Sequence, residues 1–129
     1  MTREIVPTPV VLVVDDEPLI RWSLSERLIE DGYPVRQASN GAEALAVLAT
    51  LDGQPAIVLL DLRLPDVQNL TLFRKIRALR PGVPVILITA HGSAEDAQEA
   101  MAEGAYRFVG KPFDVAEIAA LVNEARRGV

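Results

Sequence analysis

The sequence predicts an α/β fold, a three-layer sandwich in which helices cover both faces of a five-stranded parallel sheet. Two observations support this prediction. Short runs of valine, isoleucine and leucine recur along the chain, as in strands buried on both faces. A longer segment with apolar residues at helical spacing follows each run, which makes five strand–helix units. Right-handed crossovers join such units, and we expect the strand order 2-1-3-4-5, which is known for doubly wound sheets.

The first unit has the clearest boundaries. Val10 to Val14 is a continuous apolar run that ends at three acidic residues, and Pro18 then suits the first turn of a helix. Gly32 is typical of a residue that closes a helix. The other predicted strands are Tyr33–Ala38, Ala56–Leu60, Val83–Ile88 and Tyr106–Val109. The other predicted helices are Asn40–Leu48, Leu70–Leu79, Ser93–Gly104 and Asp114–Arg127, three of them with capping pairs at Asn40–Glu43, Ser93–Asp96 and Asp114–Glu117.

Length and composition fit one domain, residues 1–129, with its core between about residues 10 and 127. The net charge of −5 argues against direct nucleic-acid binding, because such surfaces are basic. The absence of cysteine excludes disulfides and Cys-based zinc sites, and His91, the single histidine, cannot form a multi-histidine site. No run approaches the ~20 apolar residues of a membrane span, and the first residues lack the layout of a signal peptide. We therefore expect a cytoplasmic protein without membrane contact.

Polar residues follow four of the five predicted strands. Asp15 and Asp16 come after the first strand, Asp61 after the third, Thr89 after the fourth and Lys111 after the fifth. The carboxyl ends of parallel strands meet at one edge of the sheet, where ligands bind in this class of fold. We therefore expect these side chains to converge although they are far apart in sequence.

The chemistry of this set points to a metal ion and a phosphoryl group. Three carboxylates in one place repel one another unless a cation joins them, and Mg²⁺ (or Mn²⁺) favours oxygen ligands together with phosphate oxygens. Lys111 and Thr89 can bind phosphoryl oxygens, and an aspartate can form an acyl phosphate. Simpler interpretations exist for each residue alone. The acidic residues can cap or begin a helix, Asp61 can belong to a turn, Thr89 can end a strand, and Lys111 can be a solvated charge.

Four motif blocks resemble those of receiver domains in two-component response regulators. They are Val13-Val14-Asp15-Asp16-Glu17, Leu60-Asp61-Leu62-Arg63-Leu64-Pro65-Asp66, Ile88-Thr89-Ala90 and Gly110-Lys111-Pro112-Phe113. The resemblance covers about residues 10–126 and implies a flavodoxin-like, (βα)5 fold.

The resemblance also implies a role for each matching residue. Asp61 is then the phosphoacceptor. Asp15 and Asp16 hold Mg²⁺ together with Asp61 and the backbone carbonyl of Arg63. Thr89 and Lys111 bind the phosphoryl oxygens, and the Lys111–Pro112 peptide bond is expected to be cis.

Phe108, three residues before Lys111, matches the switch aromatic of the family, which turns inward when the threonine moves toward the phosphoryl group. A plain core aromatic is the alternative interpretation of Phe108, and Tyr106 is expected to serve packing or an interface. Phosphorylation is then expected to repack the Ser93–Arg127 face, meaning the fourth helix, the fifth strand and the fifth helix.

Two further blocks are similar in sequence to receivers of the NtrC/AtoC type. They are Thr89-Ala90-His91-Gly92-Ser93 and Gly104-Ala105-Tyr106-Arg107-Phe108. The implied partners are a sensor histidine kinase, an ATPase and DNA-binding output in a longer chain, and a second copy bound through the Ser93–Arg127 face. A stand-alone receiver is equally compatible with the sequence.

The chain departs from the family pattern at one place and has two variable positions. Gln68-Asn69 stands where relatives usually have Asp-Gly. Arg63 and His91 lie two residues after Asp61 and Thr89, where side chains in the family tune phosphoryl hydrolysis.

Two other functions remain as alternatives. One is a receiver-like module that binds partners without phosphorylation. The other is a phosphatase with a nucleophilic aspartate, similar to the haloacid dehalogenase family, although Arg63 stands where that family needs a second aspartate. As a receiver, by contrast, the domain would not be an enzyme in the usual sense and would catalyse only its own phosphorylation and dephosphorylation. A flavin-binding flavodoxin is disfavoured by the acidic first strand–helix turn.

Overall fold

The computed structural model describes residues 8–66, 70–90 and 94–127, and within them it confirms five strand–helix units. The strands are β1 (Val10–Val14), β2 (Val35–Ala38), β3 (Ala56–Asp61), β4 (Val85–Thr89) and β5 (Arg107–Gly110). The helices are α1 (Pro18–Glu30), α2 (Gly41–Thr50), α3 (Thr71–Leu79), α4 (Ala94–Ala102) and α5 (Val115–Arg127).

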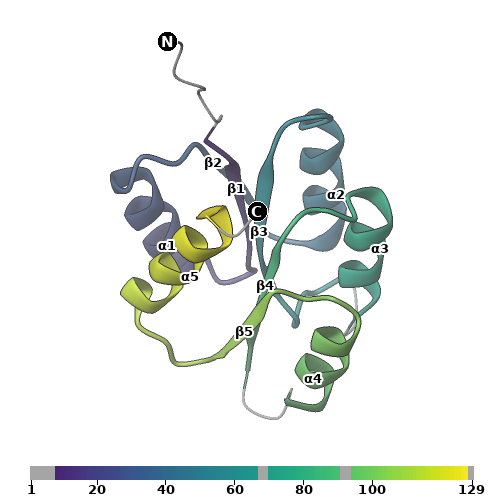
Figure 1. The fold of residues 1–129 in the computed structure, drawn as a ribbon. Coiled ribbons are helices and arrows are strands. Elements are labelled where there is room, and N and C mark those ends of the chain that lie inside the picture. The colour runs from purple at the N-terminus through teal and green to yellow at the C-terminus, as the bar shows by residue number, and fades with distance from the viewer. Residues whose placement is uncertain (1–7, 67–69, 91–93, 128–129) are drawn as a thin grey trace.

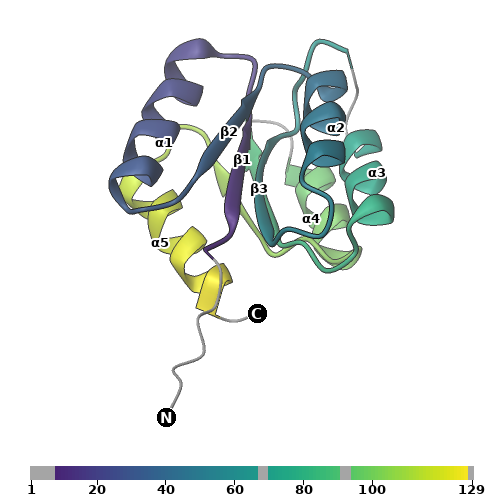
Figure 2. The ribbon, with the colours of Figure 1, turned by 90° about the horizontal axis from the view of Figure 1, so that it is seen from above.

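The strands form one parallel sheet in the predicted order β2-β1-β3-β4-β5. Helices α1 and α5 cover one face, and α2, α3 and α4 cover the other (Figure 1). The view turned by 90° shows the same three layers (Figure 2). Because β3 lies between β1 and β4, the residues at the carboxyl ends of these strands are brought to the same edge of the sheet.

Two apolar clusters, one on each face of the sheet, form the core. Leu12 and Val14 of β1 belong to the cluster under α2, α3 and α4, whereas Val11 and Val13 belong to the cluster under α1 and α5. Phe73 of α3 is fully buried in the first cluster. This double coverage explains why the strand sequence is uniformly apolar instead of alternating.

Three strands begin later in the structure than the sequence predicted. The amide of Tyr33 bonds to the Leu28 carbonyl at 3.0 Å, so Tyr33 closes α1 and β2 starts at Val35. The amide of Val83 likewise bonds within the turn, to the Arg80 carbonyl, and β4 starts at Val85. Pro34 and Pro84 have no amide to donate, which fits their place just before a strand. The predicted start of β5 was wrong by one residue.

The helix ends follow the predicted chemistry where they are described. Gly32 has φ 95° just beyond α1, a conformation that suits glycine. The Asn40 side chain accepts a hydrogen bond from the Glu43 amide at 2.8 Å, and Asp114 accepts one from the Ala116 amide at 2.9 Å. Ser93 lies outside the described residues. Among the described helices, none has the length and apolar character required to cross a membrane.

Candidate functional site

The carboxyl edge of the sheet brings the predicted acidic residues together. Asp15 directly follows β1 and Asp61 is the last residue of β3, and both side chains are buried. Asp16, next along the loop, is exposed. One carboxylate oxygen from each of the three residues lies within 4.8 Å of the other two. The convergence expected from strand topology is therefore present.

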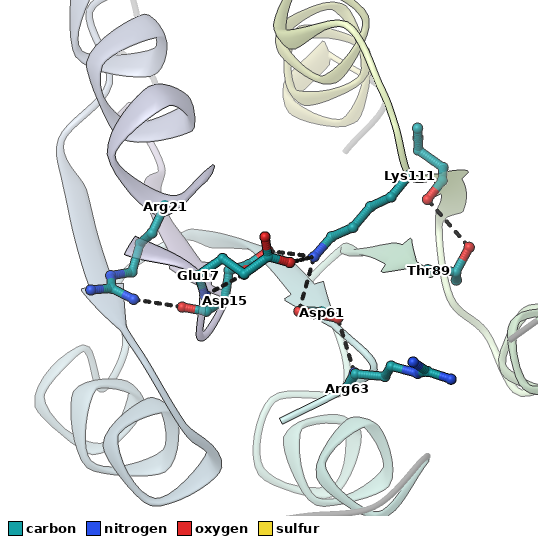
Figure 3. A network of polar contacts seen from close by, with 8 residues as sticks. Asp15, Glu17, Arg21, Asp61, Arg63, Thr89 and Lys111 are labelled. Atoms are coloured by element: carbon teal, nitrogen blue, oxygen red, sulfur yellow. Dashed lines mark hydrogen bonds and ion pairs between the residues drawn. The ribbon is translucent and has the colours of Figure 1, made fainter. Parts of the chain in front are cut away.

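Lys111 connects the acidic residues. Its Nζ lies 2.8 Å from Glu17 Oε1 and 3.3 Å from an Oδ2 atom of each of Asp15 and Asp61. The side chain reaches across the strand ends from the residue after β5 (Figure 3). Only 16% of it is exposed, so the interpretation of Lys111 as a solvated charge is wrong. The following peptide bond, Lys111–Pro112, is cis, as the resemblance implied.

Asp15 and Asp61 use their two carboxylate oxygens in the same way. Oδ1 of Asp15 accepts a hydrogen bond from the Glu17 amide, and Oδ1 of Asp61 accepts one from the Arg63 amide, each at 2.9 Å. The Oδ2 atoms are those near Lys111. Each loop after the strand thus fixes one oxygen and leaves the second directed at the centre of the site.

Burial controls the electrostatics of the site. Desolvation raises the pKa of Asp61 to about 6, against a bond from the Arg63 amide that lowers it, and the neighbouring charge of Asp15 adds to the rise. Desolvation also raises the pKa of Asp15. Desolvation lowers the pKa of Lys111, but its contacts with Glu17, Asp61 and Asp15 outweigh this and raise it. The site therefore holds more buried negative charge than Lys111 alone offsets.

A divalent cation fits this arrangement. Asp15 Oδ2 is buried and meets no hydrogen-bond geometry in the described parts of the chain, and the ammonium of Lys111, 3.3 Å away, is its ion-pair partner. Lys111 is shared with Glu17 and Asp61, so one ammonium offsets only part of the buried negative charge, and a second cation would offset more of it. Three carboxylate oxygens within 4.8 Å of one another are also the donor set that hard cations prefer. The acidic cluster is thus typical of a metal site.

Thr89 and Arg63 are placed at the edge of the cluster. Thr89 is buried at the end of β4, and its hydroxyl donates a long hydrogen bond of 3.4 Å to the Val109 carbonyl of β5. Its hydroxyl is directed to β5, not to Asp61 (Figure 3). The Arg63 side chain is exposed and extends away from Asp61, while its amide is bound by Asp61 (Figure 3).

Glu17 and Arg21 belong to the site although the sequence did not single them out. Glu17 is the nearest ion-pair partner of Lys111. Arg21 donates to the Asp15 carbonyl at 2.7 Å and to Gln37 at 3.2 Å, and so holds the loop after β1 (Figure 3). The position of Glu17 directly after Asp15-Asp16 was a usable signal. Nothing in the sequence paired Arg21 with a backbone carbonyl.

Phe108 is 43% exposed, so the interpretation as a core aromatic is wrong. Tyr106 is partly buried against the cluster under α1 and α5, and the Arg107 guanidinium lies 4.8 Å from the centre of its ring. His91, Gln68 and Asn69 lie outside the described residues.

Comparison of the sequence with known protein families identifies one family. Residues 11–123 match the response regulator receiver domain. The chain belongs to this family. Receiver domains are phosphoacceptor signalling modules and not enzymes in the usual sense, which agrees with the buried aspartate at the end of β3.

This receiver domain is similar in sequence to part of several longer regulators. It is 40% identical over 116 residues to the DNA-binding transcriptional regulator NtrC of Escherichia coli (strain K12), covering 90% of this chain and 24% of NtrC. It is 40% identical over 119 residues to the C4-dicarboxylate transport transcriptional regulatory protein DctD of Rhizobium meliloti (strain 1021), covering 92% of this chain and 25% of DctD. The chain thus spans about a quarter of the length of these two relatives.

Among solved structures, the receiver domain of NtrX from Brucella abortus superposes with a TM-score of 0.84 at 34% sequence identity, covering 92% of this chain and 99% of that one. The three relatives together place this chain among receivers of the NtrC type, as the sequences of its motifs indicated.

Proposed function

We propose that this receiver accepts a phosphoryl group on Asp61 in a reaction that depends on Mg²⁺ or Mn²⁺. The supporting observation is the buried Asp61 carboxylate, whose Oδ2 lies 3.3 Å from Lys111 Nζ and which shares a cluster with Asp15 and Asp16. A divalent cation held by these three carboxylates and the Arg63 carbonyl would offset the negative charge of the incoming group.

The residues of the chain perform the transfer as follows. A carboxylate oxygen of Asp61 attacks the phosphorus of a phosphohistidine on a sensor histidine kinase, and the phosphorus–nitrogen bond breaks with its electron pair leaving on the imidazole. The Arg63 amide holds Asp61 through Oδ1 during the attack. Lys111 neutralises charge on the transferred oxygens, because its ammonium already lies within 3.3 Å of Asp61.

The phosphoryl group then acts as a switch. It adds charge and strong acceptors to the edge of the sheet. Thr89 now donates a long bond to Val109, and this weak contact is readily exchanged for one to a phosphoryl oxygen. Phe108, exposed on β5, turns inward as Thr89 moves, and the Ser93–Arg127 face repacks. Arg63 and His91 are the side chains proposed to tune the lifetime of the phosphoryl group.

The partners follow from the same function. A sensor histidine kinase supplies the phosphoryl group in the cytoplasm. In a longer regulator the repacked Ser93–Arg127 face controls an ATPase and DNA-binding output or pairs with a second receiver. Relatives of which this chain spans only about a quarter support that proposal, since one of them is a DNA-binding transcriptional regulator.

Intact-protein mass spectrometry after incubation with acetyl phosphate tests the proposal. We expect a single phosphoryl adduct that requires both Mg²⁺ and Asp61, and therefore no adduct with EDTA or in Asp61→Asn. If wild type forms no adduct, and beryllofluoride leaves its amide spectrum unchanged, the domain is a binding module that works without phosphorylation. Sustained hydrolysis of phosphate monoesters, with many molecules of phosphate released per protein, would instead indicate a phosphatase.

A further inference from the structure

Asp66 joins the loop after β3 to the first turn of α2. One carboxylate oxygen accepts a hydrogen bond from the Gly41 amide at 2.8 Å, and the other accepts one from the Ala42 amide at 3.0 Å. These two amides lie about two dozen residues away along the chain, so the contact is tertiary and not a local turn. The same two amides lower the pKa of Asp66.

The first turn of α2 has a cap of its own. The Asn40 side chain accepts a hydrogen bond from the Glu43 amide at 2.8 Å, and the Glu43 carboxylate accepts one from the Ser39 amide at 2.7 Å. These contacts are formed within the segment that leads into the helix. Asp66 is different, because it satisfies two further amides from a separate loop, and its negative charge is favoured at a helix N-terminus.

The loop that carries Asp66 is the one that begins at Asp61. Before Arg63 it is fixed by a bond from the Leu62 amide to the Ile88 carbonyl at 3.1 Å and by the bond from the Arg63 amide to Asp61 at 2.9 Å. After Arg63, the bonds from Asp66 to α2 provide the next polar anchor in the described residues. The carbonyl of Arg63 therefore lies on a short span held at both ends.

We propose that Asp66 is a positioning residue of the metal site, which clamps this span to α2 and so fixes the direction of the Arg63 carbonyl. The inference rests on the proposed function, in which that carbonyl is a metal ligand. Ligands to a hard cation must be held in place for tight binding, and supporting contacts of this kind contribute to affinity although they never touch the ion. The clamp also ties α2, which contributes no ligand, to the geometry of the site.

Isothermal titration calorimetry with MgCl₂ on the whole chain tests the clamp, with Asn40→Ala as the matched control. Both Asp66→Ala and Asn40→Ala remove a cap of α2, so both should lower the midpoint of unfolding. Only Asp66→Ala also releases the loop. We therefore expect its Mg²⁺ dissociation constant to rise about tenfold, whereas that of Asn40→Ala stays within about twofold of wild type.

A conservative variant separates positioning from loss of structure. Asp66→Asn keeps one acceptor oxygen but loses the second and the charge, so its dissociation constant should fall between those of wild type and Asp66→Ala. Equal Mg²⁺ affinity in wild type and Asp66→Ala overturns the inference, and so does equal weakening in Asp66→Ala and Asn40→Ala. If wild type itself binds no Mg²⁺, the metal site of the proposed function fails and the clamp fails with it, which is a different result from either of these.

Discussion

Lys111 allows three carboxylates to share one edge of the sheet. Its ammonium lies between Glu17, Asp15 and Asp61, and its pairing is uneven, with Glu17 nearer than the two buried aspartates. One ammonium cannot neutralise all three, and burial keeps Asp61 with a pKa raised to about 6. The ionised form of Asp61 therefore destabilises the folded state. Binding of a cation or transfer of a phosphoryl group can draw on this free energy.

This cost makes stability depend on pH. The folded pKa of Asp61, about 6, exceeds its ordinary value of 3.8. The protonated Asp61 carboxyl therefore contributes to the free energy of unfolding. This contribution is fully present below about pH 4 and is lost as the pH rises through about 6. In EDTA, Asp61→Asn removes this loss, and its unfolding free energy relative to wild type should increase by about 3 kcal/mol between pH 4 and pH 8. Urea unfolding at both pH values measures the change.

Ser25→Ala is the control for that experiment. Ser25 is buried in α1 and cannot ionise in this range, so its effect on stability should be the same at both pH values. A constant difference between Asp61→Asn and wild type across the same range would contradict the burial argument.

Glu17 competes with Asp61 for Lys111. Its side chain is 57% exposed, so the ion pair is worth about 1 kcal/mol or less. Glu17→Gln frees Lys111 and removes a negative charge from the path of an anionic phosphodonor. We expect phosphorylation by acetyl phosphate to become about two- to fivefold faster, measured as the rate of adduct formation. Glu30→Gln, at the far end of α1, should leave the rate unchanged, and a slower rate in Glu17→Gln would show that Glu17 assists the reaction.

Individual site residues differ in how well the sequence revealed them. Asp15, Asp61 and Thr89 were predictable because strand topology alone places strand ends at one edge. The Lys111–Glu17 pair, the bond from Arg21 to the Asp15 carbonyl and the bonds from Asp66 to α2 were not. These contacts join loops through side-chain geometry, and no periodic pattern in the sequence records them.

At the scale of elements, the C-terminal end of α4 depends on Gly104. It has φ 106°, and a Cβ built there would lie 2.6 Å from Arg77 Nη2 of α3. The arginine tip can move, but the backbone conformation cannot be adopted by alanine without strain. Gly104→Ala should therefore lower the free energy of unfolding by about 2 kcal/mol, measured by urea unfolding.

Gly82 provides the matched control. It stands in the turn after α3, a Cβ there meets no atom within 4 Å, and its φ lies outside the left-handed region. Gly82→Ala should change stability by less than about 1 kcal/mol, or even increase it, because alanine restricts the unfolded chain. Equal losses in both variants would show that the conformation at Gly104 carries no special strain.

The bounds of the elements also show where sequence patterns are sufficient. β1 matched its prediction because its apolar run coincides with full burial on both faces. The starts of β2 and β4 were missed because Tyr33 and Val83 are apolar or aromatic and buried, yet their amides serve turns. Side-chain burial is visible in a sequence, whereas the partner of a single backbone amide is not.

At the scale of the whole molecule, the two apolar clusters and the acidic site share the central strands. β1 and β3 separate the clusters and also end at Asp15 and Asp61. The site is therefore assembled only when the sheet is complete, since these residues are remote from each other in the unfolded chain. Packing of the core holds the carboxylates close together, and the repulsion between them lowers the free energy of unfolding that this packing provides.

Mg²⁺ binding should consequently be coupled to global folding. A cation that binds the assembled carboxylates of Asp15, Asp16 and Asp61 stabilises the folded state alone, by about 2.7 kcal/mol at one hundred times its dissociation constant. We expect the free energy of unfolding, measured with urea at pH 7.5, to increase by this amount when MgCl₂ replaces EDTA. KCl at equal ionic strength is the control. Asp15→Asn should lose most of the shift, because it removes a ligand while leaving both apolar clusters intact. A shift of equal size in KCl, or in Asp15→Asn, would mean that ionic screening and not a specific cation relieves the repulsion.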